Sequence, residues 1–205
     1  MKEYIAKKTT LPMNVCDQRW DEAEAARLDF GWEELFPTPY NTYVRVVHCE
    51  DGFSVRLTTD EWPLRITEME LNGAVCRDSC MEVFFTPNTV DKDYINIEMN
   101  AAGITLTCIG EGRGNRARLD IEGEGVIVES RIRPMEGWDV MLYVPYSFVR
   151  KYFSTVDKTF RANFYKCGDL TVRPHYSTWN PVEVEKPDYH QSSFFGKVTF
   201  SDEAL

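Results

Sequence analysis

Hydrophobic and polar residues alternate with a period of two along most of this chain, which is typical of β-strands that bury one face. The alternating segments are short, and turn signals such as Asp51-Gly52 separate them. Strand patterns do not alternate with helix patterns along the chain, as a parallel sheet with crossover helices would require. The predicted strands are 42–48, 53–59, 79–86, 94–99, 104–109, 126–133, 138–144, 159–166, 173–178 and 194–200.

Two segments favour helix instead. Residues 20–28 read WDEAEAARL, which combines good helix formers with acidic residues in the first turn. Residues 146–153 predict a second short helix. We therefore expect an all-β fold, an antiparallel β-sandwich of two sheets and about ten strands with a short N-terminal helix on its edge. No repeat, low-complexity tract or linker divides the chain, so residues 1–205 are predicted to form a single domain.

The alternation also sorts the side chains of three predicted strands into two faces, one apolar and one carrying polar groups. The second face carries Cys80, Glu82 and Phe84 in one strand, Tyr94, Asn96, Glu98 and Asn100 in another, and Arg161, Asn163 and Tyr165 in a third. A solvated outer face is one interpretation. The alternative is a binding face for sugar hydroxyls, because Asn, Arg and Glu are planar groups with directional donors and acceptors.

Two of the five tryptophans lie where predicted strands end. Trp62 precedes Pro63, and Trp179 stands in the sequence Ser177-Thr178-Trp179-Asn180-Pro181. An indole at such an edge can stack on the apolar face of a sugar, and packing at the rim of the fold is the alternative. Trp138 is expected in the core because it shares a strand face with Val140 and Leu142.

The overall charge excludes one class of partner. The formal net charge is -10, whereas a protein that holds phosphate groups through Lys and Arg is basic. We therefore expect neither nucleic acid nor an anionic membrane surface as a partner. Residues 1–10, MKEYIAKKTT, lack an apolar run of signal-peptide length, which predicts a cytoplasmic protein, or an extracellular one if a leader was removed. The six cysteines are then expected to be reduced.

Motifs for common catalytic chemistry are absent from the sequence. The three histidines form no H-E-x-x-H pattern, the cysteines form no paired C-x-x-C, and G-x-S-x-G does not occur. The Gly-rich segment 110–114 lacks the strand–turn–helix context of a phosphate-binding loop. The 33 carboxylates leave a glycosidase-type pair open. We expect no cofactor; Asp91 and Asp93 are a candidate for calcium, and a solvated turn is the more common role of such residues.

Several segments, in order along the chain, resemble motifs of the carbohydrate-binding module family 9-like domains. They are RDSCMEVFF at 77–85, YINIEMNAAG at 94–103, RANFYKC at 161–167, STWNP at 177–181, PDYH at 187–190 and FGKVTF at 195–200. The resemblance implies an antiparallel β-sandwich that holds a sugar between two Trp side chains, with polar groups bonded to its hydroxyls and, in some members, structural calcium.

Carried onto this chain, the resemblance implies a set of ligand-binding residues. Trp179 falls in the STWNP motif, and Trp62 is the expected second wall. The polar residues expected to bond the sugar are Arg161, Asn163, Glu82, Asn96 and Glu98. We expect the protein to bind carbohydrate without catalysing a reaction and to have a role in carbohydrate catabolism. A small glycoside hydrolase that uses carboxylates on the same face and a protein-interaction domain are the alternatives. The sequence specifies neither the sugar nor the oligomeric state.

Overall fold

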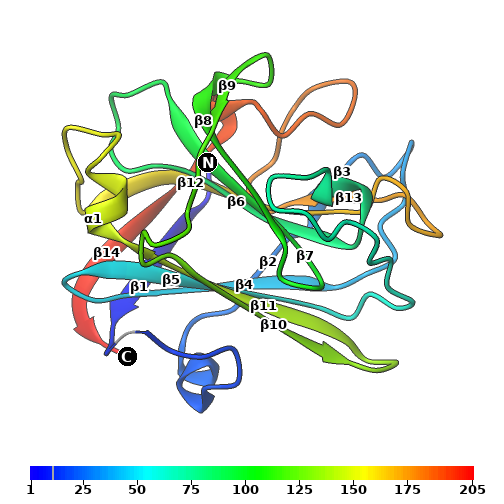
Figure 1. Ribbon diagram of the computed structural model, residues 1–205, viewed down its shortest axis with the longest axis horizontal. Helices are drawn as coiled ribbons and strands as arrows, with labels where there is room; N and C mark the ends of the chain where they lie inside the picture. Colours follow the sequence, from blue (N-terminus) through cyan, green and yellow to red (C-terminus); the bar gives the residue numbers. More distant parts are fainter. Residues whose placement is uncertain (11) are drawn as a thin grey trace.

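In the computed structural model, which describes residues 1–10 and 12–205, fourteen strands are joined by hydrogen bonds, eleven of them along one path (Figure 1). Along this path the strand order is β10-β11-β5-β4-β1-β14-β12-β6-β7-β8-β9, while β13 pairs with β12 and β3, and β2 pairs with β4. The strands are β1 (Glu3–Lys8), β2 (Ala26–Arg27), β3 (Phe30–Gly31), β4 (Thr42–His48), β5 (Gly52–Thr59), β6 (Cys80–Thr86), β7 (Tyr94–Asn100), β8 (Thr105–Gly112), β9 (Asn115–Arg118), β10 (Ile127–Arg133), β11 (Gly137–Pro145), β12 (Thr159–Cys167), β13 (Tyr176–Thr178) and β14 (Gly196–Ala204).

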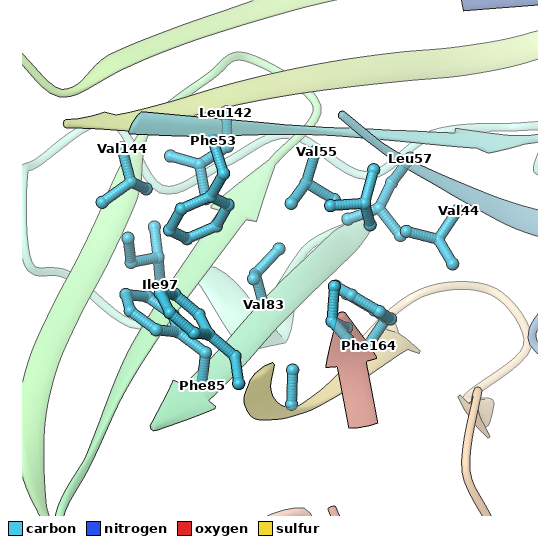
Figure 2. Close-up of a cluster of buried hydrophobic side chains, with 14 of the residues drawn as sticks. Val44, Phe53, Val55, Leu57, Val83, Phe85, Ile97, Leu142, Val144 and Phe164 are labelled. Carbon is cyan, nitrogen blue, oxygen red and sulfur yellow. The ribbon is translucent and has the colours of Figure 1, made fainter. Parts of the chain in front are cut away.

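The two halves of this path face each other across the main core. Figure 1 shows β4, β5, β10 and β11 as one layer, with β6, β7, β8 and β12 opposite and β1 and β14 closing one side. In Figure 2, Phe53 and Val55 of the first layer point toward Val83 and Phe85 of the second. These are alternate residues of their strands, so the period-two pattern of the sequence places them on one face. Full burial of each such side chain contributes roughly 1.5–3 kcal/mol.

The other face of β6, β7 and β12 is also covered. Every residue of β6 and of β7 is buried, although only one face of each contributes to the main core. A second hydrophobic cluster covers the remaining face and contains Trp32, Val75, Phe84, Tyr94, Tyr165, Tyr189 and Phe195. Segments that lie far apart in the sequence therefore enclose the face that the alternation pattern had left open to solvent or ligand.

The predicted N-terminal helix at 20–28 is wrong. The segment forms a 3₁₀-helix at Gln18–Glu22, and the backbone is extended again at Ala23. Asp17 caps this turn by accepting a hydrogen bond from the Arg19 N–H, and β2 follows with Ala26 paired to Val44 of β4. Tertiary pairing overrides the helix propensity because an isolated helix of this length is marginal in water. The second predicted helix is present in shorter form as α1 (Tyr146–Val149).

The prediction of a purely antiparallel arrangement of about ten strands also needs correction. The ten predicted strands are present, with ends that shift by up to a few residues. Four further strands, β1, β2, β3 and β9, were missed. Of these, β1 pairs in parallel with β14 and with β4 and thereby connects the two layers. Among the helices that the structure describes, none is long and apolar enough to cross a membrane.

Candidate ligand-binding site

A cavity of about 630 Å³ lies over the second face of β6, β7 and β12. Strand register builds its floor, because Glu82 of β6 is paired with Glu98 of β7 on one side and with Tyr165 of β12 on the other. Paired residues of neighbouring strands point to the same side of the sheet. The cavity is lined by Cys76, Glu82, Glu98, Leu106, Arg113, Arg116, Cys167, Asp169, Tyr176, Pro187, Asp188, Tyr189 and His190.

The two glutamates of the floor are almost completely buried. Glu82 is 3% exposed and Glu98 is 4% exposed. A Glu98 carboxylate oxygen accepts a hydrogen bond of 3.0 Å from the Asn96 amide and lies 3.7 Å from a guanidinium nitrogen of Arg116. Glu82 accepts a hydrogen bond of 3.1 Å from the Cys167 thiol.

Burial changes the acidity of both carboxyl groups. It raises the pKa of Glu98 from 4.5 to about 7, against the opposing effect of Arg116 and Arg113. Burial, reinforced by the neighbouring Glu98 carboxylate, raises the pKa of Glu82 well above its ordinary value. At neutral pH the floor therefore holds protonated as well as ionised carboxyl groups. It can donate hydrogen bonds as well as accept them.

Replacing Glu98 with glutamine should make the protein relatively more stable as the pH rises. Because the folded-state pKa of Glu98 is raised, its contribution to stability is present below the unfolded value of 4.5 and is lost as the pH rises through about 7. A tenfold change in proton affinity corresponds to about 1.4 kcal/mol. The free energy of unfolding of Glu98→Gln, relative to that of wild type, should therefore be higher at pH 8 than at pH 4 by about 3 kcal/mol.

Urea denaturation of both proteins across this pH range measures the difference. Glu111→Gln, at an exposed position of β8, is the control and should show no such pH dependence. A difference between Glu98→Gln and wild type that is the same at both ends of the range would contradict the raised pKa.

Charged side chains from two loops form the rim of the cavity. A guanidinium nitrogen of Arg113, at the tip of the β8–β9 hairpin, lies 3.1 Å from a carboxylate oxygen of Asp188. Asp188 also accepts hydrogen bonds from the His190 backbone N–H and from the Gln191 side chain. This contact joins the hairpin to the segment 187–190, which lies near it at the top of Figure 1.

Aromatic residues hold the segment 187–190 against the sheet. The rings of Tyr189 and Tyr165 are stacked with their centroids 4.1 Å apart. The Tyr189 hydroxyl donates to the Lys166 carbonyl at 2.8 Å, and the Tyr165 hydroxyl donates to the Tyr189 carbonyl at 3.1 Å. Burial lowers the pKa of the adjacent His190 to about 3, so this imidazole is neutral at physiological pH and lies 2.7 Å from the Tyr94 hydroxyl.

Three of the residues predicted from the sequence meet at this cavity. Glu82 and Glu98 line it, and Asn96 contacts both Glu98 and Arg116 from the next position on the same face of β7. The alternation pattern identified these residues because the two strands are regular and their register is direct.

The two tryptophans do not form walls of this cavity. Trp179 is 2% exposed and belongs to the main core, where it packs on Phe164 with ring centroids 5.4 Å apart. The prediction that Trp179 stacks on a sugar is therefore corrected, since neither face of the indole is open to a ligand. Trp62 is 39% exposed and lies in a separate surface depression with Tyr40 and Arg173.

Arg161 and Asn163 have structural contacts instead. Arg161 donates hydrogen bonds to the backbone carbonyls of Asp91 and Ser192 at a different surface depression. Asn163 is fully buried, donates to the Asn180 carbonyl and accepts from the Asn180 N–H. These bonds occupy the amide of Asn163 and the two terminal guanidinium nitrogens of Arg161, which were predicted to meet sugar hydroxyls. Both residues therefore connect segments of the fold rather than line the cavity.

Sequence reasoning missed most of the rim. Arg113 lies in the Gly-rich segment 110–114, which was considered as a phosphate-binding loop and rejected. Arg116 lies two residues after that segment, and Asp169 lies in no quoted motif. The PDYH motif was noticed without being assigned to the site, although Pro187, Asp188, Tyr189 and His190 all line the cavity. The charged and aromatic residues of these two loops were the available signal.

Comparisons with known proteins agree with the fold and identify the family. The chain matches the model of carbohydrate-binding family 9 over residues 21–200. No curated protein has a sequence that matches it. A solved structure of a Bacteroides uniformis protein, to which carbohydrate binding has been ascribed, is 26% identical, with a TM-score of 0.83 over 98% of this chain and 99% of that one.

Two further solved structures share the fold. They are of a carbohydrate-binding module family 9 from Caldicellulosiruptor kristjanssonii. One is in complex with cellotriose, with a TM-score of 0.70 and 11% identity over 100% of this chain and 95% of that one. The other is in complex with glucose, with a TM-score of 0.67 and 11% identity over 99% of this chain and 97% of that one.

Proposed function

The chain belongs to carbohydrate-binding family 9, and on that premise we propose that it binds a carbohydrate, without cleaving it, in the cavity over β6, β7 and β12. The observation that carries this proposal is the cavity floor, where Glu82 and Glu98 lie side by side with Arg116 above them. The ascribed carbohydrate binding of the Bacteroides uniformis protein and the sugars bound by the two Caldicellulosiruptor kristjanssonii modules support it.

The chemistry of the cavity suits sugar hydroxyls. Each hydroxyl donates one hydrogen bond and accepts others, so it needs acceptors and donors close together. Glu82 and Glu98 accept in their ionised form, whereas Arg116 and Arg113 donate from the rim. The volume of about 630 Å³ is within the usual range for small-molecule sites. The rings of Tyr176 and Tyr189 provide apolar surface for the C–H groups of a sugar.

The position of the two carboxyl groups favours binding over hydrolysis. A glycosidase places its acid and its nucleophile or base on opposite sides of the bond that is cleaved. Glu82 and Glu98 instead come from neighbouring strands and point the same way from one wall of the cavity. The glycoside hydrolase alternative would require a second carboxylate across the cavity. Of the two aspartates that line it, Asp188 is already bonded to Arg113, which leaves Asp169 as the other candidate.

The wider organisation of the protein follows as part of the same proposal. Two facing β layers in a sandwich, formed by a single domain of residues 1–205, would present this cavity on the second face of β6, β7 and β12. A cytoplasmic protein of carbohydrate catabolism would use this cavity to retain a soluble sugar. The high net negative charge of -10 disfavours polyanionic partners such as nucleic acid.

Binding experiments with Arg116 and Trp62 variants test where the sugar lies. We expect Arg116→Ala to weaken binding about ten- to a hundredfold, because a charge-assisted hydrogen bond is worth roughly 1.5–3 kcal/mol. Trp62→Ala removes an exposed aromatic residue that lies in a separate depression, so it should leave the affinity unchanged. Calorimetry with glucose, cellotriose and the hits of a glycan array measures both affinities.

The pattern of the two variants decides the location. Loss of affinity in Trp62→Ala with full affinity in Arg116→Ala would move the site to the Trp62 depression. Chromatography of each bound oligosaccharide after long incubation checks the absence of cleavage, and release of shorter products by wild type but not by Glu82→Gln would establish the hydrolase alternative.

A further inference from the structure

Two thiols and a carboxyl group meet at the floor of the cavity. Cys80 of β6 is paired with Cys167 of β12 in the sheet register, and Glu82 is two residues further along β6 on the same face. The Cys167 sulfur lies 3.1 Å from a Glu82 carboxylate oxygen, and one ligand atom from each of the three residues lies within 4.8 Å of the other two. All three side chains are buried.

The charges around this cluster favour a cation. The cavity is lined by four acidic residues, Glu82, Glu98, Asp169 and Asp188, but by only two guanidinium groups. Arg113 pairs with Asp188, and Arg116 lies beside Glu98. Within the part of the chain that the structure describes, Glu82 forms no ion pair, and its one hydrogen-bond donor is the Cys167 thiol. A buried carboxyl group in this position either stays protonated or needs a cation beside it.

We propose that Cys80, Glu82 and Cys167 form a binding site for a thiophilic divalent cation, and that the preferred ion is Zn²⁺. Thiolate and carboxylate ligands of zinc lie at about 2.3 Å and 2.0–2.2 Å from the metal, so tetrahedral ligand atoms lie roughly 3.5–4 Å from one another. The spacing of the cluster brackets this separation. Two sulfur ligands select zinc over calcium or magnesium, which prefer oxygen.

The cavity supplies both an entry path and a fourth position. Glu82 and Cys167 line the cavity, whereas Cys80 lies beneath them, so an ion can reach the cluster from solvent. Three protein ligands leave one coordination position for water or for a ligand in the cavity. A sugar hydroxyl that enters the cavity would reach this position. A metal bound here would therefore also contact a sugar in the cavity, but metal binding itself can be measured without sugar.

Metal binding must release protons from the cluster. Burial raises the pKa of the Cys80 thiol to about 11, and the neighbouring Cys80 thiol together with burial raises the pKa of Cys167 well above its ordinary value. Each thiol therefore gives its proton to solvent when its sulfur binds the metal, and Glu82, whose pKa burial also raises, releases the proton that it carries when its carboxylate binds. Uptake should strengthen with rising pH, and a pH indicator should detect the released protons.

Titration of the full chain with Co²⁺ and Cd²⁺, in the presence of a phosphine reductant, tests the proposal. We expect one ion per chain, a thiolate-to-metal charge-transfer band, proton release, and displacement of the band by Zn²⁺ but not by Ca²⁺ or Mg²⁺. Cys80→Ser and Cys167→Ser should each lose the band. Cys108→Ser, which removes a buried thiol outside the cluster, should retain it.

Two further variants keep the result interpretable. Glu82→Gln conserves the shape of the side chain, so it should fold and bind the ion more weakly; circular dichroism checks the fold of every variant. Absence of the band in folded wild type, or a band that persists in a folded Cys80→Ser/Cys167→Ser double variant, overturns the proposal. Sugar affinity is measured separately and without metal. A negative result for metal binding therefore leaves the proposed carbohydrate binding intact.

Discussion

Replacing Lys166 with methionine is expected to lower the free energy of unfolding by about 3–5 kcal/mol, because it leaves a buried carboxylate without its counter-ion. Lys166 is 0% exposed, and its ammonium lies 2.9 Å from a carboxylate oxygen of Glu61 and 2.7 Å from the His175 ring. The Glu61 carboxylate also accepts hydrogen bonds from Trp138 and Ser79.

The neighbours of Glu61 keep it ionised inside the protein. Burial by itself would raise the pKa of Glu61, but Lys166 and then His175 outweigh burial and hold the pKa below its ordinary value. Removing the ammonium therefore strands a negative charge in a site with no access to water.

Urea denaturation followed by circular dichroism measures the effect of Lys166→Met. The double variant Glu61→Gln/Lys166→Met should recover part of the loss, because the stranded charge is gone. Lys197→Met, which breaks an exposed pair with Glu3, is the matched control and should cost no more than about 1 kcal/mol. A cost for Lys166→Met as small as that of the control would show that the buried pair contributes little.

Replacing Phe164 with alanine should cost about 3–5 kcal/mol in free energy of unfolding through the cavity that it leaves. Phe164 is 1% exposed and points from β12 into the main core, where Figure 2 shows it near Val83 and Leu57. Trp179 packs against its ring and cannot fill the space, because the indole is itself enclosed by the core. The neighbouring residue Tyr165 lies on the cavity face of the same strand.

The same denaturation experiment, with Phe30→Ala as control, measures this loss. Phe30 is an exposed aromatic residue of the two-residue strand β3, so its removal should cost less than half as much. Equal costs for the two variants would show that the main core relaxes around the missing ring. Wild-type sugar affinity in folded Phe164→Ala would show that the core and the cavity face of β12 act independently.

The alternation of side chains in the sequence predicted where the strands lie and which of their residues face the core. The apolar face that this pattern separates from the polar one carries Val83, Ile97 and Phe164, and all three belong to the main core. This part of the fold is readable because side-chain direction in a strand depends only on parity along the chain. The same parity placed Glu82 and Glu98 on one face, and β6–β7 register brought them together.

Local sequence was a poor guide at the edges of the fold. Residues 20–28 have helix-forming composition, yet they lie in a 3₁₀ turn and a short strand because Trp20 is buried and Ala26 pairs with β4. Trp179 lies two residues before Pro181, where a predicted strand ends, yet it is enclosed by the core. Neither outcome depends on the neighbouring residues alone. Both depend on which distant segments cover them.

By itself, therefore, the sequence determined the all-β class, the positions of ten strands and the acidic pair on the second face of β6 and β7. Only the tertiary structure decided that this face is enclosed, and by which segments. The rim residues Arg116 and Tyr189 lie 18 and 91 positions after Glu98 along the chain, and no periodic pattern relates positions so far apart. Their meeting is set by the hydrogen bonds and ring contacts that hold the β8–β9 hairpin and the segment 187–190 over the sheet.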